Sequence, residues 1–180
     1  MRIQCNDTAA IVVDIQERLF RHIYENEKLE KNINILIRGL RIFEIPILVT
    51  QQYTKGLGPT TPSVSEALGY FEPIEKLSFS CCGSLKFLEL LEKLGKSHLL
   101  LFGIETHVCV LQTALDLLEK KYTPVIIEDC VSSRKPNDKV IALERLKKEG
   151  SIISTMESIL FELTEEAGTE QFKEISKLVK

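Results

Sequence analysis

The sequence of 180 residues lacks several features that mark common classes of protein. It has no apolar run of about 18 residues, the length that a membrane-spanning helix needs, so we expect no contact with a membrane. Its N-terminus has no apolar segment ahead of a small-residue cleavage site, as a secretory signal peptide would. It has no cluster of lysines and arginines, and its net charge is −3, so we expect no nucleic-acid partner.

The cysteines and histidines also lack the spacings of disulfide scaffolds and zinc sites. The cysteines form no C-x-x-C pair and suit a reducing compartment, so we predict a cytoplasmic protein. The scattered histidines argue against a zinc site. No G-x-G-x-x-G motif follows the first predicted strand, which argues against a dinucleotide cofactor. These residues are Cys5, Cys81, Cys82, Cys109 and Cys130, with His22, His98 and His107.

What the sequence does contain is a regular alternation of predicted strands and helices. Short apolar runs are typical of buried parallel strands, and the segments between them carry the apolar stripe of amphipathic helices. The alternation predicts an α/β protein, one domain over residues 1–180, with a parallel sheet covered by helices on both faces. We expect strands at 9–14, 46–50, 74–77, 98–102, 124–127 and 151–154, and helices at 27–43, 84–94, 108–121, 137–148, 157–163 and 169–178. Residues 51–62 predict a long loop, and Glu128 and Asp129 are expected to cap the turn after the fifth strand.

Three chemically useful residues follow predicted strands. Asp14 ends the first strand, Lys76 lies at the third, and Cys109 begins the helix after the fourth. In parallel sheets ligands bind outside the carboxyl ends of the strands, so these residues are candidates for one site. Each also has a simpler interpretation: Asp14 as a helix cap, Lys76 as a surface lysine and Cys109 as a packed core thiol.

Together the three residues would make a nucleophilic site. A helix N-terminus and the charge of Lys76 would both favour the thiolate of Cys109. Asp14 could accept the thiol proton and later return it to a leaving group. Backbone N–H groups in the turn 103–109 could bind an oxyanion.

The motifs that hold these residues resemble the isochorismatase-like cysteine hydrolases. The matching pieces are Val13-Asp-Ile-Gln16, Glu75-Lys-Leu-Ser-Phe-Ser80 and Gly103-Ile-Glu-Thr-His-Val-Cys-Val110, and the resemblance covers about residues 8–163. It is closest to the branch of isochorismatase domain-containing proteins, through the segments 51–60, 109–118 and 129–134.

The resemblance implies a three-layer, Rossmann-like fold with a six-stranded parallel sheet in the order 3-2-1-4-5-6, assembled as a homo-oligomer of two or more chains. It implies that Asp14, Lys76 and Cys109 are the catalytic triad. It also implies a cis peptide at Ile104–Glu105, with the N–H groups of Glu105 and Cys109 forming the oxyanion hole. The implied activity is hydrolysis of a small amide or related C–N bond through an acyl-thioester.

One departure from the family narrows the expected chemistry. Nicotinamidases carry a metal site with histidines in the loop after strand two, whereas residues 51–65 here contain no Asp, Glu or His. We therefore predict no catalytic metal and no cofactor, and a small-molecule substrate other than nicotinamide. A rival hypothesis is a vestigial triad in a protein that acts by binding or assembly. Candidate pocket residues, each of which could equally be ordinary packing, are Gln16, Phe20, Gln52, Tyr53 and Phe79.

Overall fold

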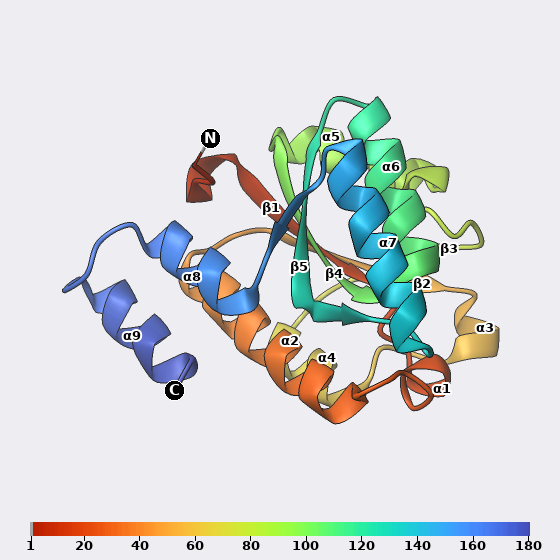
Figure 1. Ribbon diagram of the computed structural model, residues 1–180, viewed down its shortest axis with the longest axis horizontal. Coiled ribbons are helices and arrows are strands. Elements are labelled where there is room, and N and C mark those ends of the chain that lie inside the picture. Colours follow the sequence, from red (N-terminus) through yellow and green to blue (C-terminus); the bar gives the residue numbers. More distant parts are fainter. Residues whose placement is uncertain (1) are drawn as a thin grey trace.

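Six parallel strands form the sheet at the centre of the molecule, a computed structural model that describes residues 2–180 (Figure 1). Their order is β3-β2-β1-β4-β5-β6, so the predicted α/β class and strand order are confirmed. Because the order reverses between β1 and β4, the carboxyl ends of these two strands flank the point where ligands bind in open α/β sheets. The strands are β1 (Thr8–Val13), β2 (Ile47–Gln52), β3 (Ile74–Lys76), β4 (His98–Ile104), β5 (Thr123–Ser132) and β6 (Ile152–Ser154).

The two central strands are buried along their whole length. Every residue of β1 and of β4 is buried, as expected for strands covered on both faces. Their continuous apolar runs are what made these strands recognisable in the sequence. Together they fix the positions of the residues that follow them, which include Asp14 and the turn that leads to Cys109.

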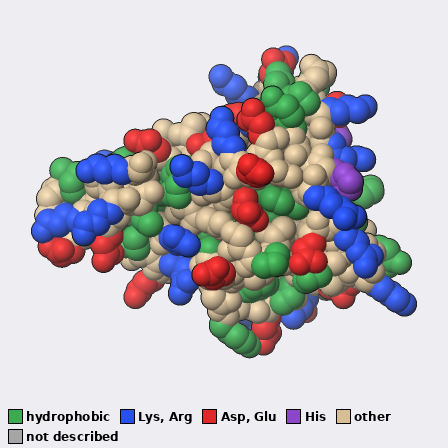
Figure 2. Space-filling view, turned by 90° about the horizontal axis from the view of Figure 1, so that it is seen from below, with side chains coloured by type: hydrophobic (Ala, Val, Ile, Leu, Met, Phe, Trp, Pro, Cys, Tyr) green, Lys and Arg blue, Asp and Glu red, His purple; other side chains and the backbone are tan. Residues whose placement is uncertain are grey.

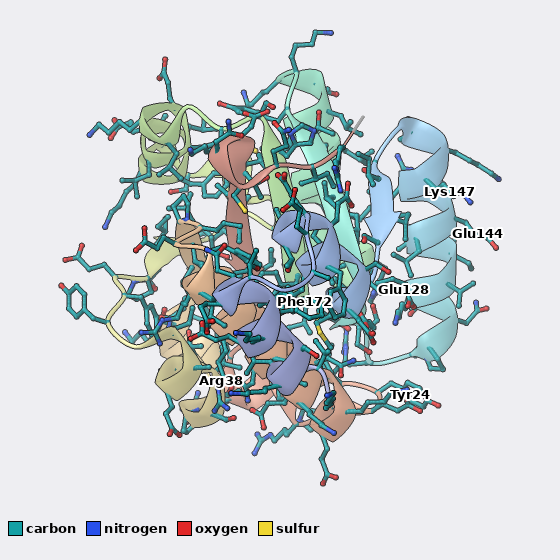
Figure 3. The ribbon with its side chains drawn as sticks, turned by 90° about the vertical axis from the view of Figure 1, so that its left-hand side faces the viewer. Tyr24, Arg38, Glu128, Glu144, Lys147 and Phe172 are labelled. Carbon is teal, nitrogen blue, oxygen red and sulfur yellow. The ribbon has the colours of Figure 1, made fainter. Side chains whose placement is uncertain are left out.

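The helices cover the two faces of the sheet as two layers (Figure 1). On one face lie α2 (Asn26–Ile42), α4 (Pro62–Leu68), α8 (Met156–Thr164) and α9 (Glu170–Leu178). On the other lie α5 (Leu85–Leu94), α6 (Leu111–Glu119) and α7 (Pro136–Glu149). Figure 3 looks onto the first layer, with Arg38 of α2 and Phe172 of α9 in front and Glu144 and Lys147 of α7 directed into solvent at the side.

Two local predictions differ from the structure, and one short helix was not predicted. The predicted loop contains the end of β2, the short helix α3 (Thr54–Leu57) and the start of α4. Glu128 and Asp129 do not cap a turn, because they lie inside β5, where the pairing with β4 skips from Ile126 to Val131. This irregularity bends β5 sharply (Figure 1). Because two acidic residues stand at the bend, the apolar pattern of the sequence did not predict that the strand continues. A further short helix, α1 (Glu17–Phe20), follows β1.

Gly103 allows β4 to approach β1 closely near the candidate site. Its backbone φ of +126° lies in a region that residues with a side chain rarely adopt. A Cβ at this position would also overlap the carbonyl oxygen of Val13. Gly103 and Val13 are paired in the sheet. The glycine therefore brings the backbone that carries Asp14 against the strand that leads to Cys109.

The surface mixes charges of both signs. In Figure 2, lysines and arginines alternate with acidic side chains over the visible face. No helix within residues 2–180 is long and apolar enough to cross a membrane.

Candidate active site

Asp14 and Lys76 form a buried ion pair at the carboxyl edge of the sheet. The Lys76 Nζ donates to Asp14 Oδ2 at 2.6 Å, and both side chains are fully shielded from solvent. Nζ also donates to the carbonyl oxygens of Ser78 at 3.1 Å and Phe79 at 2.9 Å. All three protons of the ammonium group are thus directed at acceptors within the protein. The pair is held in one geometry, as a preorganised site requires.

The other oxygen of Asp14 is held by Thr50. The Thr50 hydroxyl donates to Asp14 Oδ1 at 2.8 Å, and it accepts a weak hydrogen bond from the thiol of Cys81 at 3.6 Å. Asp14 itself has a φ of 50°, a left-handed conformation that aspartate tolerates better than most residues. This conformation turns the chain directly after β1.

Cys109 lies near the start of the helix that follows β4. A π-helical turn, Thr106–Val110, precedes α6, so the helix begins two residues before the predicted start. Cys109 is the fourth residue of this turn and is 3% exposed. Its sulfur lies 3.5 Å from Gln52 Oε1, and the neighbouring charges of Asp14 and Lys76 both act on it.

The pKa of the Cys109 thiol is raised, not lowered as the sequence analysis expected. Burial is the largest cause, and the negative charge and hydrogen bonding of Asp14 raise the pKa further. The positive charge of Lys76 lowers it, but by less than the other effects raise it. The resting nucleophile candidate is therefore a neutral thiol beside a carboxylate. Proton transfer to Asp14 would have to accompany its attack.

The charge of Lys76 is secured by its neighbours. Burial alone would lower the pKa of this lysine, but the negative charge of Asp14 and its hydrogen bond raise the pKa. Burial likewise raises the pKa of Cys81 to about 12 and that of Cys82 to about 11, so these thiols, like Cys109, are neutral at physiological pH.

Gln16 holds the end of β2 in place beneath the site. Its Oε1 accepts from the backbone N–H of Gln52 at 2.7 Å, and its Nε2 donates to the carbonyl oxygens of Gln52 at 3.1 Å and Gly58 at 2.7 Å. Gln16 is fully buried. Its polar atoms are thus used to position backbone and do not face open space.

The other pocket candidates divide into two groups. Phe20 is 7% exposed and belongs to the hydrophobic core, not to the rim of the site. Tyr53, 52% exposed, and Phe79, 51% exposed, present aromatic surface beside Gln52 and Lys76 respectively. Leu77, which was not a candidate in the sequence, is 78% exposed. Exposed apolar side chains thus follow Gln52 and Lys76 closely along the chain.

The turn between β4 and Cys109 has the backbone geometry that the resemblance implied. The peptide bond Ile104–Glu105 is cis. Glu105 is 5% exposed, and its carboxylate accepts from the backbone N–H of Arg134 at 3.1 Å and from Arg134 Nε at 3.0 Å. Arg134 thus fixes the side chain of Glu105. His107 contacts Ser133 Oγ at 2.9 Å and lies outside the triad candidates.

The residues around the triad do not gather as metal ligands. Within residues 2–180, no three side chains of His, Cys, Asp or Glu lie close enough together to hold a metal ion. The end of β2 carries Gln51 and Gln52, and Gln51 Nε2 donates to Thr60 Oγ1 at 2.9 Å.

Sequence reasoning missed two supporting residues. Thr50 ends the run of β2, and the strand order 3-2-1 places it beside the end of β1, so the topology itself could have paired it with Asp14. Arg134 stood within a motif of the resemblance, but only the fold shows that it meets Glu105.

Comparisons with known proteins identify the family of the chain. The profile of the Isochorismatase domain matches residues 8–158. The chain is 36% identical to isochorismatase domain-containing protein 2 of Bos taurus over 179 residues, which cover 99% of this chain and 86% of that protein.

Solved structures show the same fold. The structure of the MAR1 ribonuclease from Caenorhabditis elegans has a TM-score of 0.93 and 37% identity, covering 99% of this chain and 92% of that one. The YcaC gene product of Escherichia coli, described as an octameric hydrolase of unknown specificity, has a TM-score of 0.87 and 23% identity, covering 92% and 83%. The match of the domain profile and the full-length relatives show that this chain belongs to the isochorismatase family.

Proposed function

We propose that this protein is a metal-independent cysteine hydrolase that cleaves a small amide or related C–N bond through an acyl-thioester. The observation that carries the proposal is the juxtaposition of the Cys109 thiol with the buried Asp14–Lys76 pair at the carboxyl edge of the sheet. Membership of the isochorismatase family supports a hydrolase. The substrate and the roles of the residues are our inference.

The first half of the reaction forms the acyl-thioester. As the Cys109 sulfur attacks the carbonyl carbon, its proton passes to Asp14, and the C=O electron pair moves onto the oxygen. Backbone N–H groups of Glu105 and Cys109 stabilise that oxyanion. When the oxyanion collapses, the C–N bond breaks and Asp14 gives its proton to the leaving nitrogen.

The second half regenerates the enzyme. Asp14, again a carboxylate, takes a proton from water as the water oxygen attacks the thioester carbon. The C–S bond then breaks, and the proton returns from Asp14 to the sulfur. The net reaction converts an amide and water into a carboxylic acid and an amine.

Lys76 supports both halves without transferring a proton itself. Its ammonium group is bound to Asp14 and to two carbonyl oxygens, so it holds the carboxylate in place. Its positive charge also partly offsets the effects of burial and of Asp14, which raise the pKa of Cys109. This favours the thiolate that develops during attack.

The site favours a small neutral substrate over RNA. A nucleic acid needs cations for its phosphates, but the ammonium group at the centre of the site is already bound to protein acceptors. The net charge of −3 opposes a polyanion as well. The C. elegans relative is named a ribonuclease, so RNA belongs among the substrates to be tested.

We also propose that the chain forms a homo-oligomer. Tyr53, Leu77 and Phe79 leave apolar surface exposed around the site, which an adjoining subunit would shield from water. The octameric state described for the YcaC gene product, which has the same fold, supports the proposal that this chain also forms a homo-oligomer. Size-exclusion chromatography with light scattering tests this, and a monomer at micromolar concentration would contradict it.

The function is tested by screening small amides, ureas and carbamoyl compounds against the wild type and the Cys109→Ala variant. We expect turnover of at least one compound by the wild type and its loss in the variant. Activity that survives in Cys109→Ala would refute the assignment of the nucleophile. A wild type that turns over nothing while it binds a partner would favour the rival hypothesis of a vestigial triad.

A further inference from the structure

The side chain of Gln52 lies beside the candidate nucleophile with a defined orientation. Its Nε2 donates to the carbonyl oxygen of Leu77 at 3.3 Å, and its Oε1 lies 3.5 Å from the sulfur of Cys109. A carbonyl oxygen can only accept a hydrogen bond, so the amide nitrogen must face Leu77. The oxygen of the amide therefore faces the reacting sulfur.

The backbone of Gln52 is as firmly held as its side chain. Gln16 binds both its N–H and its carbonyl oxygen, and its partner across the sheet is Lys76 of the triad. A fixed backbone and a fixed amide leave Oε1 little freedom to turn away. The site thus presents a preorganised hydrogen-bond acceptor next to the point of attack.

A hydrogen-bond acceptor at this position distinguishes a leaving nitrogen that carries a hydrogen from a leaving oxygen that does not. Since Oε1 lies 3.5 Å from the sulfur, a carbonyl carbon about 3–3.5 Å from that sulfur can be oriented with its leaving atom within hydrogen-bond distance of Oε1. An amide nitrogen offers an N–H to this oxygen. An ester or enol-ether oxygen has only lone pairs, so it would face Oε1 without a hydrogen bond.

We propose that Gln52 is a specificity-determining residue, which accepts a hydrogen bond from the scissile N–H and so selects amides over esters of the same shape. The inference rests on the proposed function, because it assumes that Cys109 is the attacking group. It goes further by assigning the choice between nitrogen and oxygen leaving groups to one oxygen atom.

The test compares two alkylating probes, 2-chloroacetamide and methyl chloroacetate. In both, the sulfur forms a bond to the chloromethyl carbon, chloride leaves and the thiol proton passes to Asp14 and then to solvent. No bond to nitrogen or oxygen breaks in this reaction, so the NH₂ or OCH₃ group beside the same carbonyl stands in for the leaving group presented to Oε1, and it is the one feature in which the probes differ. Rates of modification at Cys109 are measured by peptide mass spectrometry and divided by the rates with 2-mercaptoethanol, which removes the intrinsic difference in reactivity.

We expect the wild type to prefer the amide over the ester by about fivefold, the equivalent of one neutral hydrogen bond. Gln52→Met, which removes the acceptor at similar volume, should abolish the preference. Gln52→Glu keeps an acceptor oxygen, so it should retain the preference although its charge slows both probes. The matched control is Gln112→Met, an exposed glutamine on α6, which should behave as the wild type.

Two results would overturn the inference, and they are distinguishable. An unchanged amide preference in Gln52→Met would show that Gln52 does not select the leaving atom, while labelling at Cys109 would leave the proposed function intact. Absence of labelling at Cys109 in the wild type, with modification elsewhere, would overturn the proposed function and this inference with it.

Discussion

Replacement of Lys76 by methionine tests whether the buried ion pair holds the site together. The Lys76 Nζ and the Asp14 Oδ2 are 2.6 Å apart, and neither side chain is accessible to solvent. Methionine is close to lysine in length, so Lys76→Met removes the charge with little change in packing. It leaves the Asp14 carboxylate buried with two neutral partners, the Thr50 hydroxyl and the Cys109 thiol.

The size of the effect follows from that burial. Breaking a buried pair by removing one partner costs about 3–5 kcal/mol of stability, because an uncompensated charge stays in the interior. Removing both charges together, in Asp14→Asn with Lys76→Met, should cost about 2 kcal/mol less than Lys76→Met alone, since no buried charge remains. Asparagine also suits the left-handed backbone at this position.

The assay is urea unfolding at one protein concentration, followed by circular dichroism because the chain has no tryptophan. Lys86→Met, which replaces an exposed lysine on α5, is the control and should change stability by less than about 0.5 kcal/mol. The reasoning is refuted if Lys76→Met destabilises by less than about 1 kcal/mol, or if the double variant is no more stable than the single one.

Three further predictions follow from the geometry. Asp14→Asn removes the base that accepts the thiol proton during attack, while burial still keeps the pKa of Cys109 raised, so alkylation of Cys109 by iodoacetamide at about pH 8 should be slower than in the wild type; an equal or faster rate would contradict this. Gly103→Ala forces a Cβ against the Val13 carbonyl, so it should lower stability by several kcal/mol or prevent folding, and a melting temperature near that of the wild type would be the contrary result. Gln16→Leu leaves buried backbone groups without partners and should cost about 2–4 kcal/mol in urea unfolding, whereas a neutral effect would show that water replaces the side chain.

The sequence predicted the fold well where one pattern dominated. The apolar runs of β1 and β4 mark buried parallel strands, and the amphipathic stripe of α2 gave that helix to within one residue at each end. Predictions failed where tertiary contacts override the local pattern. Glu128 and Asp129 lie within β5, at the point where its regular pairing with β4 is interrupted. The local sequence gives no sign of this interruption.

The candidate site shows the same division. The resemblance identified Asp14, Lys76 and Cys109, and the fold brings them together. The direction in which the pKa of Cys109 is shifted could not be predicted from the sequence. It depends on how far burial and the charge of Asp14, which raise the pKa, outweigh the charge of Lys76, which lowers it. The orienting role of Thr50 likewise depends on strand register, which the chain's local composition does not contain.

The central claim is that Cys109 attacks the substrate and carries the acyl group. Its most direct test is intact-protein mass spectrometry after rapid acid quench with an activated acyl donor such as 4-nitrophenyl acetate, followed by peptide mapping. The account predicts one acetyl group, on Cys109, in the wild type and none in Cys109→Ala. An acetyl group on another cysteine, or equal acylation of the variant, would contradict it.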